Sequence, residues 1–88
     1  MGEISRLRNL GPASESVLAE AGITKADTLR RLGSVEAYAR AVEAGAKPNL
    51  NLLFAIEGAL TDRHWARLGG ATRSFLILAA DDRLSRGC

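Results

Sequence analysis

Apolar residues recur along this chain at helical spacing, and no useful stretch shows the alternation typical of a strand. Val35, Tyr38, Ala39 and Val42, for example, fall on one face of a helix with a 3.6-residue period. Each such stretch is short and ends at a glycine or at a break rich in Gly, Pro or Asn. The pattern predicts an all-α fold of five or six short helices in one compact domain.

Capping residues and glycines set the boundaries that we expect for these helices. Thr24 is expected to cap a helix that has Asp27 in its first turn and that stops at Gly33. Ser34 is then expected to cap the next helix. The predicted helices cover residues 12–21, 24–33, 34–45, 50–60 and 71–84, with shorter pieces of helix at 3–8 and 62–68.

The segment 50–60, LNLLFAIEGAL, is the most apolar of these helices and is expected to be the central one. Gly58 inside it costs about 1 kcal/mol relative to alanine, which predicts a close helix crossing at that point. Glu57 lies beside this glycine on an otherwise apolar helix. We expect its carboxylate to pair with an arginine or to cap backbone amides.

A tight turn is predicted at residues 9–12, Asn-Leu-Gly-Pro. Asn9 tolerates a positive φ, and Gly11 can adopt backbone angles that a larger residue resists. Pro12 fits the first position of a helix, where its missing N–H is not needed. The free N–H groups and the positive dipole end of that helix suit a phosphate. The alternative is that the turn is only a structural corner between packed helices.

Composition narrows the class of protein. The 88 residues fit one domain, and 47% hydrophobic with 25% charged residues is typical of a folded chain. The longest apolar run, residues 75–80, is far too short for a membrane span, and the N-terminus has no apolar signal core. The single Cys88 excludes an intrachain disulfide, so a cytoplasmic location is expected. A net charge of +2 does not by itself indicate nucleic-acid binding.

Candidate catalytic chemistry is sparse. His64 is the only histidine, and no Cys, Asp or Glu stands at metal-ligand spacing from it. Its neighbour Trp65 is expected to pack against the 50–60 helix, with His64 as a cap or hydrogen-bond partner. The sequence has no glycine-rich nucleotide loop, zinc spacing or Ser-His-Asp set. We therefore predict a protein that is not an enzyme and that holds no metal or cofactor.

Residues 6–33 resemble a helix-hairpin-helix module. The residues that match its pattern are Leu10, Gly11, Val17, Leu18, Gly22 and Ile23. In DNA-binding members of that family, backbone amides of the hairpin hold a phosphate without reading sequence. The chain departs from the pattern at Asn9, where a glycine is usual, and at Ala13, where a basic residue is usual.

A more specific resemblance covers residues 4–68. The matching pieces are Asn9-Leu10-Gly11-Pro12, Gly22-Ile23, Leu32-Gly33-Ser34-Val35, Tyr38, Leu50-Asn51-Leu52-Leu53, Glu57-Gly58-Ala59-Leu60 and His64-Trp65. With these the chain resembles the C-terminal domain of the TfoX/Sxy regulators of natural competence. The resemblance implies one all-α domain over 1–88, with its core in 4–68, linked to regulation of DNA-uptake genes. Regulators of this type usually carry another domain before this one.

Two functions in different classes follow from these observations. In the first, the module contacts the DNA backbone without sequence preference, and its expected phosphate contacts are Arg8, Asn9, Leu10, Gly11, Ala13, Lys25, Arg30 and Arg31. In the second, the domain binds a transcription factor, RNA polymerase or a second copy of itself, without DNA contact. The missing basic residue at Ala13 and the acidic Glu15 favour the second function, and an exposed apolar patch on the last helix would support it.

Some residues are expected to have structural roles, and the basic residues named as phosphate contacts have a second interpretation. The structural positions are Gly22, Ile23, Tyr38, Gly58 and Trp65. The scattered basic side chains can equally form a solvated face without a ligand. No membrane partner is expected.

Overall fold

The computed structural model describes residues 4–7, 9–62 and 67–86. A 3₁₀ turn, η1 (Ile4–Arg6), is followed by helices α1 (Pro12–Glu20), α2 (Ala26–Glu43), α3 (Leu50–Thr61) and α4 (Gly70–Arg86). These ranges contain helices and no strand, which confirms the all-α prediction. The expected number of helices, five or six, is wrong, because the described part of the chain forms four α-helices.

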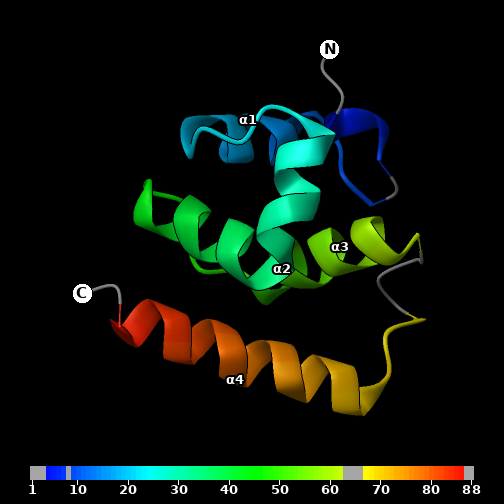
Figure 1. Cartoon of the computed structure of the whole chain (residues 1–88), viewed down its shortest axis with the longest axis vertical. Helices are drawn as coiled ribbons and strands as arrows, with labels where there is room; N and C mark the ends of the chain where they lie inside the picture. The colour runs from blue at the N-terminus through cyan, green and yellow to red at the C-terminus, as the bar shows by residue number, and fades with distance from the viewer. Residues whose placement is uncertain (1–3, 8, 63–66, 87–88) are drawn as a thin grey trace.

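Helix α2 is the centre of the arrangement. It packs against α1, α3 and α4, whereas α1 and α4 lie on opposite sides of it (Figure 1). The segment 50–60, which we expected to be central, packs as α3 against α2 and, less extensively, against α4. The reason is length: α2 has 18 residues and α3 only 12, so α2 can offer separate stretches to three neighbours.

A bend at Gly33 divides α2 and explains much of the difference in helix number. The sequence predicts two helices that meet there, and Gly33 is indeed non-helical, with a helical stretch on each side of the kink that together make up α2. Gly33 has φ 81° and ψ 168°, a backbone conformation that is essentially restricted to glycine. Ser34 does not cap a new helix; its hydroxyl turns toward α3 instead.

The expected starts of two other helices also need correction. Helix α2 begins at Ala26, and its N-cap is Lys25, without a side-chain hydrogen bond, so Thr24 is not the cap. The helix expected over 3–8 is reduced to the 3₁₀ turn Ile4–Arg6. The first turn of a helix fixes several dihedral angles for few hydrogen bonds, so a helix of only about six residues gains too little to form over its whole length. The helix-hairpin-helix element is therefore not established.

The helix expected at 62–68 lies largely outside the described residues.

Two helices end in the same glycine-containing cap. After α1, Gly22 has φ 82°, its N–H donates to the Ala19 carbonyl at 2.9 Å, and the Ile23 N–H donates to the Leu18 carbonyl at 2.9 Å. This pair of bonds is a Schellman motif, and the buried Ile23 adds the hydrophobic contact that accompanies it. The end of α2 repeats the arrangement with Gly45 at φ 115°. Both glycines thus give the left-handed turn that reverses the chain.

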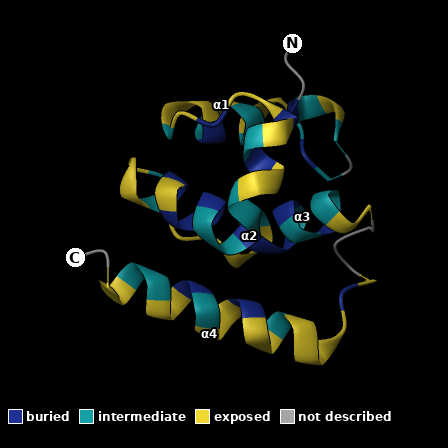
Figure 2. Ribbon diagram, viewed as in Figure 1, coloured by how far each residue is buried: buried dark blue, intermediate teal, exposed yellow. Residues whose placement is uncertain are grey.

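The core is a single cluster to which each element contributes. The largest fully buried side chains are Ile4, Leu18, Ile23, Leu29, Leu53 and Ile56. Figure 2 shows the buried residues concentrated where α2 and α3 face their neighbours, with the outer sides of α1 and α4 exposed. This cluster fixes η1 and α1 against the first half of α2.

The position of Glu57 on α3 differs from the expectation. Its carboxylate accepts a hydrogen bond of 2.7 Å from the Ser34 hydroxyl. The partner is therefore a serine, where we expected an arginine or backbone amides. Ser34 is buried, and so is Gly58, the residue that follows Glu57 in α3. The bond links the bend of α2 to α3 across 23 positions of sequence.

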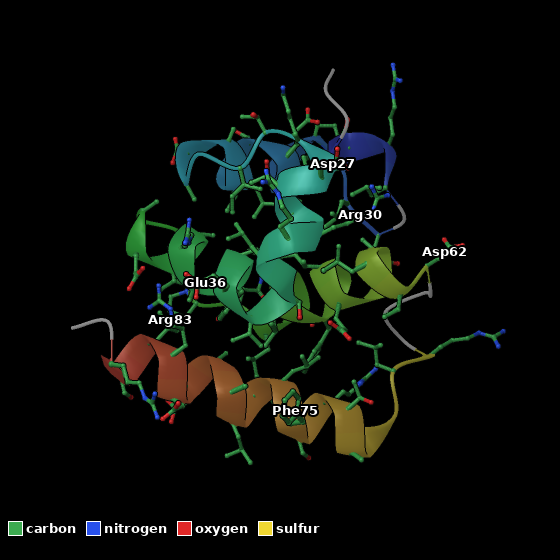
Figure 3. The ribbon with its side chains drawn as sticks, in the orientation of Figure 1. Asp27, Arg30, Glu36, Asp62, Phe75 and Arg83 are labelled. Carbon is green, nitrogen blue, oxygen red and sulfur yellow. The ribbon has the colours of Figure 1, made fainter. Side chains whose placement is uncertain are left out.

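An ion-pair network ties α4 to α2. Arg83 donates from Nε to Glu36 Oε1 at 2.8 Å and from Nη1 to Glu43 Oε2 at 3.0 Å, and Glu36 also accepts from Arg40 at 2.8 Å. Hydrogen bonds from Arg83 and then Arg40 lower the pKa of Glu36 to about 2. Figure 3 shows Glu36 and Arg83 facing one another between the two helices. Leu76 and Ala80 supply the buried apolar part of the same contact.

Candidate functional site

A cleft of about 500 Å³ opens between the start of α1 and the start of α3. We call it the α1–α3 cleft. Its lining residues are Asn9, Ala13, Ser14, Val17, Ala46, Lys47, Asn49, Asn51, Leu52 and Ala55. Of these only Lys47 is ionisable, and the rest are amides, one hydroxyl and small or aliphatic side chains. The cleft therefore joins a single positive charge to a set of neutral hydrogen-bonding groups.

The α1 side of the cleft is an uncapped helix start. Asn9 has φ 71°, so it takes the left-handed conformation expected of it, whereas Gly11 is extended at φ −114° and ψ −170°. Gly11 is the N-cap and has no side chain to bond the helix, and the first helical bond runs from the Glu15 N–H to the Gly11 carbonyl. The N–H groups of Ala13 and Ser14 therefore have no acceptor within the helix.

Glu15 stabilises this start from the other side. Its Oε2 accepts a hydrogen bond of 2.9 Å from the backbone N–H of Ser5 in η1. The side chain is partly buried and is not among the residues that line the cleft. Its carboxylate therefore holds η1 against α1, and as an acidic group in the first turn it offsets part of the positive end of the helix dipole.

The α3 side is held in place by Tyr38. The buried Tyr38 hydroxyl accepts from the backbone N–H of Asn49 at 3.1 Å, and the Asn49 side chain accepts from the Asn51 N–H at 2.9 Å. Asn49 is thus the N-cap of α3, and that helix satisfies its own first turn. Lys47 is exposed and lies two residues before this cap. Tyr38 in α2 therefore sets where Lys47 stands relative to α1.

Anion binding is the chemistry that this arrangement supports. Backbone N–H groups at a helix start and a lysine ammonium both favour a phosphate or carboxylate. The lining contains one titratable side chain, Lys47, and one hydroxyl, Ser14, and it contains no carboxylate, imidazole or thiol. Among the described residues, no three His, Cys, Asp or Glu side chains gather closely enough to hold a metal ion.

The structure places the predicted phosphate contacts in different settings. Asn9 and Ala13 line the cleft, while Leu10 is buried beneath the turn as its anchor. Lys25, Arg30 and Arg31 are exposed, and none of them lines the cleft.

Arg30 forms a pair with Asp27 at 3.5 Å, and Figure 3 shows both near the start of α2. Arg8, His64 and Trp65 lie outside the described residues.

Sequence reasoning missed Lys47, Asn49 and Asn51. The break at 46–49 is visible in the sequence, but only the folded arrangement brings it to the same cleft as Asn9. The local signal that could have identified these residues is a second break between helices that contains Gly, Pro and Asn, as the turn at 9–12 does.

The fold and the cleft define a small all-α domain in which the start of a helix and a lysine line one cleft. The chain belongs to the TfoX C-terminal domain family, whose model matches residues 1–80.

Two crystal structures of Listeria monocytogenes proteins are similar to it. One, an uncharacterized protein in a triclinic form, is 34% identical with a TM-score of 0.79, covering 84% of each chain. The other, a protein of unknown function in a tetragonal form, is 32% identical with a TM-score of 0.81, covering 89% of this chain and 96% of that one. No protein of curated function matches the chain.

A helix must be both long and apolar to cross a membrane. Across residues 4–7, 9–62 and 67–86, none combines the length and the apolar content that a crossing requires.

Proposed function

We propose that this domain is a non-catalytic regulatory module that contacts the DNA backbone weakly and without sequence preference, in the regulation of competence or other DNA-related genes. The observation that carries the proposal is the α1–α3 cleft, in which the uncapped start of α1 meets Lys47. A DNA phosphate would accept from the N–H groups of Ala13 and Ser14 while the Lys47 ammonium neutralises its charge.

Weak affinity follows from the size of this site. One lysine and one helix start neutralise only one or two phosphates, so binding is expected to be salt-dependent and to read no bases. Lys25, Arg30 and Arg31 are exposed and can supplement the contact on a longer duplex. The resemblance to TfoX regulators implies a role in DNA-related regulation, and the lining of the cleft supports a phosphate contact.

An NMR titration with a short DNA duplex at two salt concentrations tests the proposal. At low salt we expect the largest amide shifts at residues 9–14 and around Lys47, and we expect them to shrink strongly at the higher salt. Duplexes of different sequence should give the same shifts, because phosphates carry no sequence information. If no amide near residues 9–14 moves at low salt, the DNA function is excluded.

A pair of charge-matched variants sharpens the test. Lys47→Gln should weaken binding and lower the slope of log affinity against log salt by about one, because one phosphate contact is lost. Arg86→Gln removes the same charge from the far end of α4, which lies across α2 from α1 (Figure 1), and should leave the slope unchanged. Equal effects of the two variants would mean that the domain acts only through its net charge.

A second candidate is a protein-interaction module without DNA contact. The observation that favours it is the outer side of α4, where Phe75 is 68% and Leu78 is 70% exposed. Large apolar side chains grouped on a surface mark interaction sites more often than isolated ones do. Absence of DNA shifts together with a partner whose binding is lost in Phe75→Ser would select this candidate.

A further inference from the structure

Helix α4 presents two different faces. Its inner face buries Leu76 and Ala80, and the Arg83 network adds polar bonds to α2. Its outer face carries Phe75 and Leu78, each more than two-thirds exposed. Figure 2 shows this outer side of α4, away from α2, as largely exposed. Two such side chains, one helical turn apart, are the largest exposed apolar groups among the described residues.

The exposed residues of α4 have the spacing of a helix-packing seam. Ala71, Phe75, Leu78, Asp82 and Ser85 are all exposed and follow one another at intervals of four, three, four and three. This interval is the heptad spacing by which two helices pack along a shared seam, at a crossing angle near 20°. Phe75 and Leu78 are the large apolar residues of this seam and occupy adjacent positions of it, so its apolar part is one helical turn long.

We propose that the occupant of this face is a second copy of the chain, with its α4 running antiparallel. A two-fold axis midway between Phe75 and Leu78 sets each of these residues against the other in the second copy. The seam is thus complementary to itself, as an interface with two-fold symmetry requires. The dimer deepens and rests on the second candidate function, because it names the partner of the protein-interaction module.

Charge selects the antiparallel arrangement. Asp82 lies toward the C-terminal end of the seam, where its Oδ2 is 3.2 Å from Arg86 Nε in an exposed ion pair. In the antiparallel pair, Asp82 comes beside the start of α4 in the second copy, where free N–H groups, the positive dipole end and the exposed Arg67 attract it. A parallel pair would instead set Asp82 against Asp82, with like charges in contact.

The dimer leaves the α1–α3 cleft open. Helices α1 and α4 lie on opposite sides of α2, and none of the cleft's lining residues belongs to α4 (Figure 1). Two apolar side chains per copy form a small contact, so we expect the weak, concentration-dependent class of interface. Failure of the dimer and failure of DNA binding are therefore separate results.

Analytical ultracentrifugation of the full chain under reducing conditions tests the dimer. We expect the mass to rise from one to two copies as the concentration increases to about 1 mM. Phe75→Ser and Leu78→Ser should both stay monomeric, with unchanged circular dichroism because the side chains are exposed. The matched control is Leu50→Ser on α3, a leucine that is 42% exposed and lies outside the seam, and it should dimerise as the unchanged chain does.

Cysteine crosslinking in a Cys88→Ser background tests the direction of pairing. With a rise of 1.5 Å per residue, position 71 of one copy lies level with position 82 of the other along an antiparallel pair, whereas the two copies of position 82 are offset by about 16 Å. The double variant Ala71→Cys/Asp82→Cys keeps Phe75 and Leu78 and should therefore crosslink on mild oxidation, and Asp82→Cys alone should not. The proposal is overturned if the chain remains monomeric, if Leu78→Ser still dimerises, or if Asp82→Cys alone crosslinks as readily as the double variant.

Discussion

The bend at Gly33 supports a prediction about backbone conformation alone. Gly33 has φ 81° and ψ 168°, and a Cβ added there would meet nothing within 4 Å. Gly33→Ala therefore causes no steric clash with neighbouring groups, and its whole cost is backbone strain of about 1–3 kcal/mol. If the alanine relaxes to helical angles instead, α2 straightens and loses packing, which costs stability by another route.

Gly70→Ala is the matched control for this change. Gly70 lies in the first turn of α4, its φ is not positive, and a Cβ there also meets nothing within 4 Å. Both substitutions reduce the conformational freedom of the unfolded chain by a similar amount, so their difference isolates the strain in the folded state. We expect Gly70→Ala to change the free energy of unfolding by at most about 0.5 kcal/mol, and in the stabilising direction.

Urea unfolding followed by far-UV circular dichroism measures the difference. A gap of about 2 kcal/mol between the two variants is expected, which corresponds to roughly 8–16 °C in melting temperature for a domain of this size. An unfolding free energy for Gly33→Ala within about 0.5 kcal/mol of that for Gly70→Ala would refute the reasoning. It would mean that the bend is not set by the conformation of Gly33.

Two further predictions concern the polar links of α2. Glu36 has a pKa of about 2 in the folded protein against an ordinary 4.5, so its contribution to the free energy of unfolding is complete above about pH 4.5 and is lost as the pH falls toward 2. Glu36→Gln should therefore remove this decrease of stability at acid pH. It should also lower the free energy of unfolding at neutral pH by about 1–2 kcal/mol, a value that allows for solvent screening of a partly exposed pair. An unchanged decrease at acid pH in unfolding curves at several pH values would contradict the role of Arg83. Ser34→Ala should cost about 1.5 kcal/mol in the same assay, because Glu57 loses a 2.7 Å bond, and a loss below about 0.3 kcal/mol would contradict it.

Local signals in the sequence were enough to predict the helices and the glycines at which they end. The 3.6-residue stripes predict helices near the observed positions, and Gly22 closes α1 in the left-handed conformation expected of it. These features depend on a few neighbouring residues. The break expected at Gly33 is present as well, because this residue is non-helical and the two helical stretches of α2 meet there at a kink.

Contacts between distant residues could not be read from local pattern. Ser34 and Glu57 are 23 positions apart, and Arg83 reaches Glu36 across 47 positions. Each pairing depends on the angle at which two helices pack, which no short window contains. For the same reason Lys47 was left out of the expected phosphate contacts, although it lines the same cleft as Asn9.

The second half of α2 positions both proposed surfaces, through different side chains. Tyr38 fixes the start of α3 by bonding Asn49, and so places Lys47 at the cleft. Glu36 bonds Arg83, and so fixes α4 with its outer face toward solvent. Because the two side chains point to different neighbours, loss of Glu36 should disturb α4 and spare the cleft. A change at Gly33 alters the direction of the whole half and should disturb both.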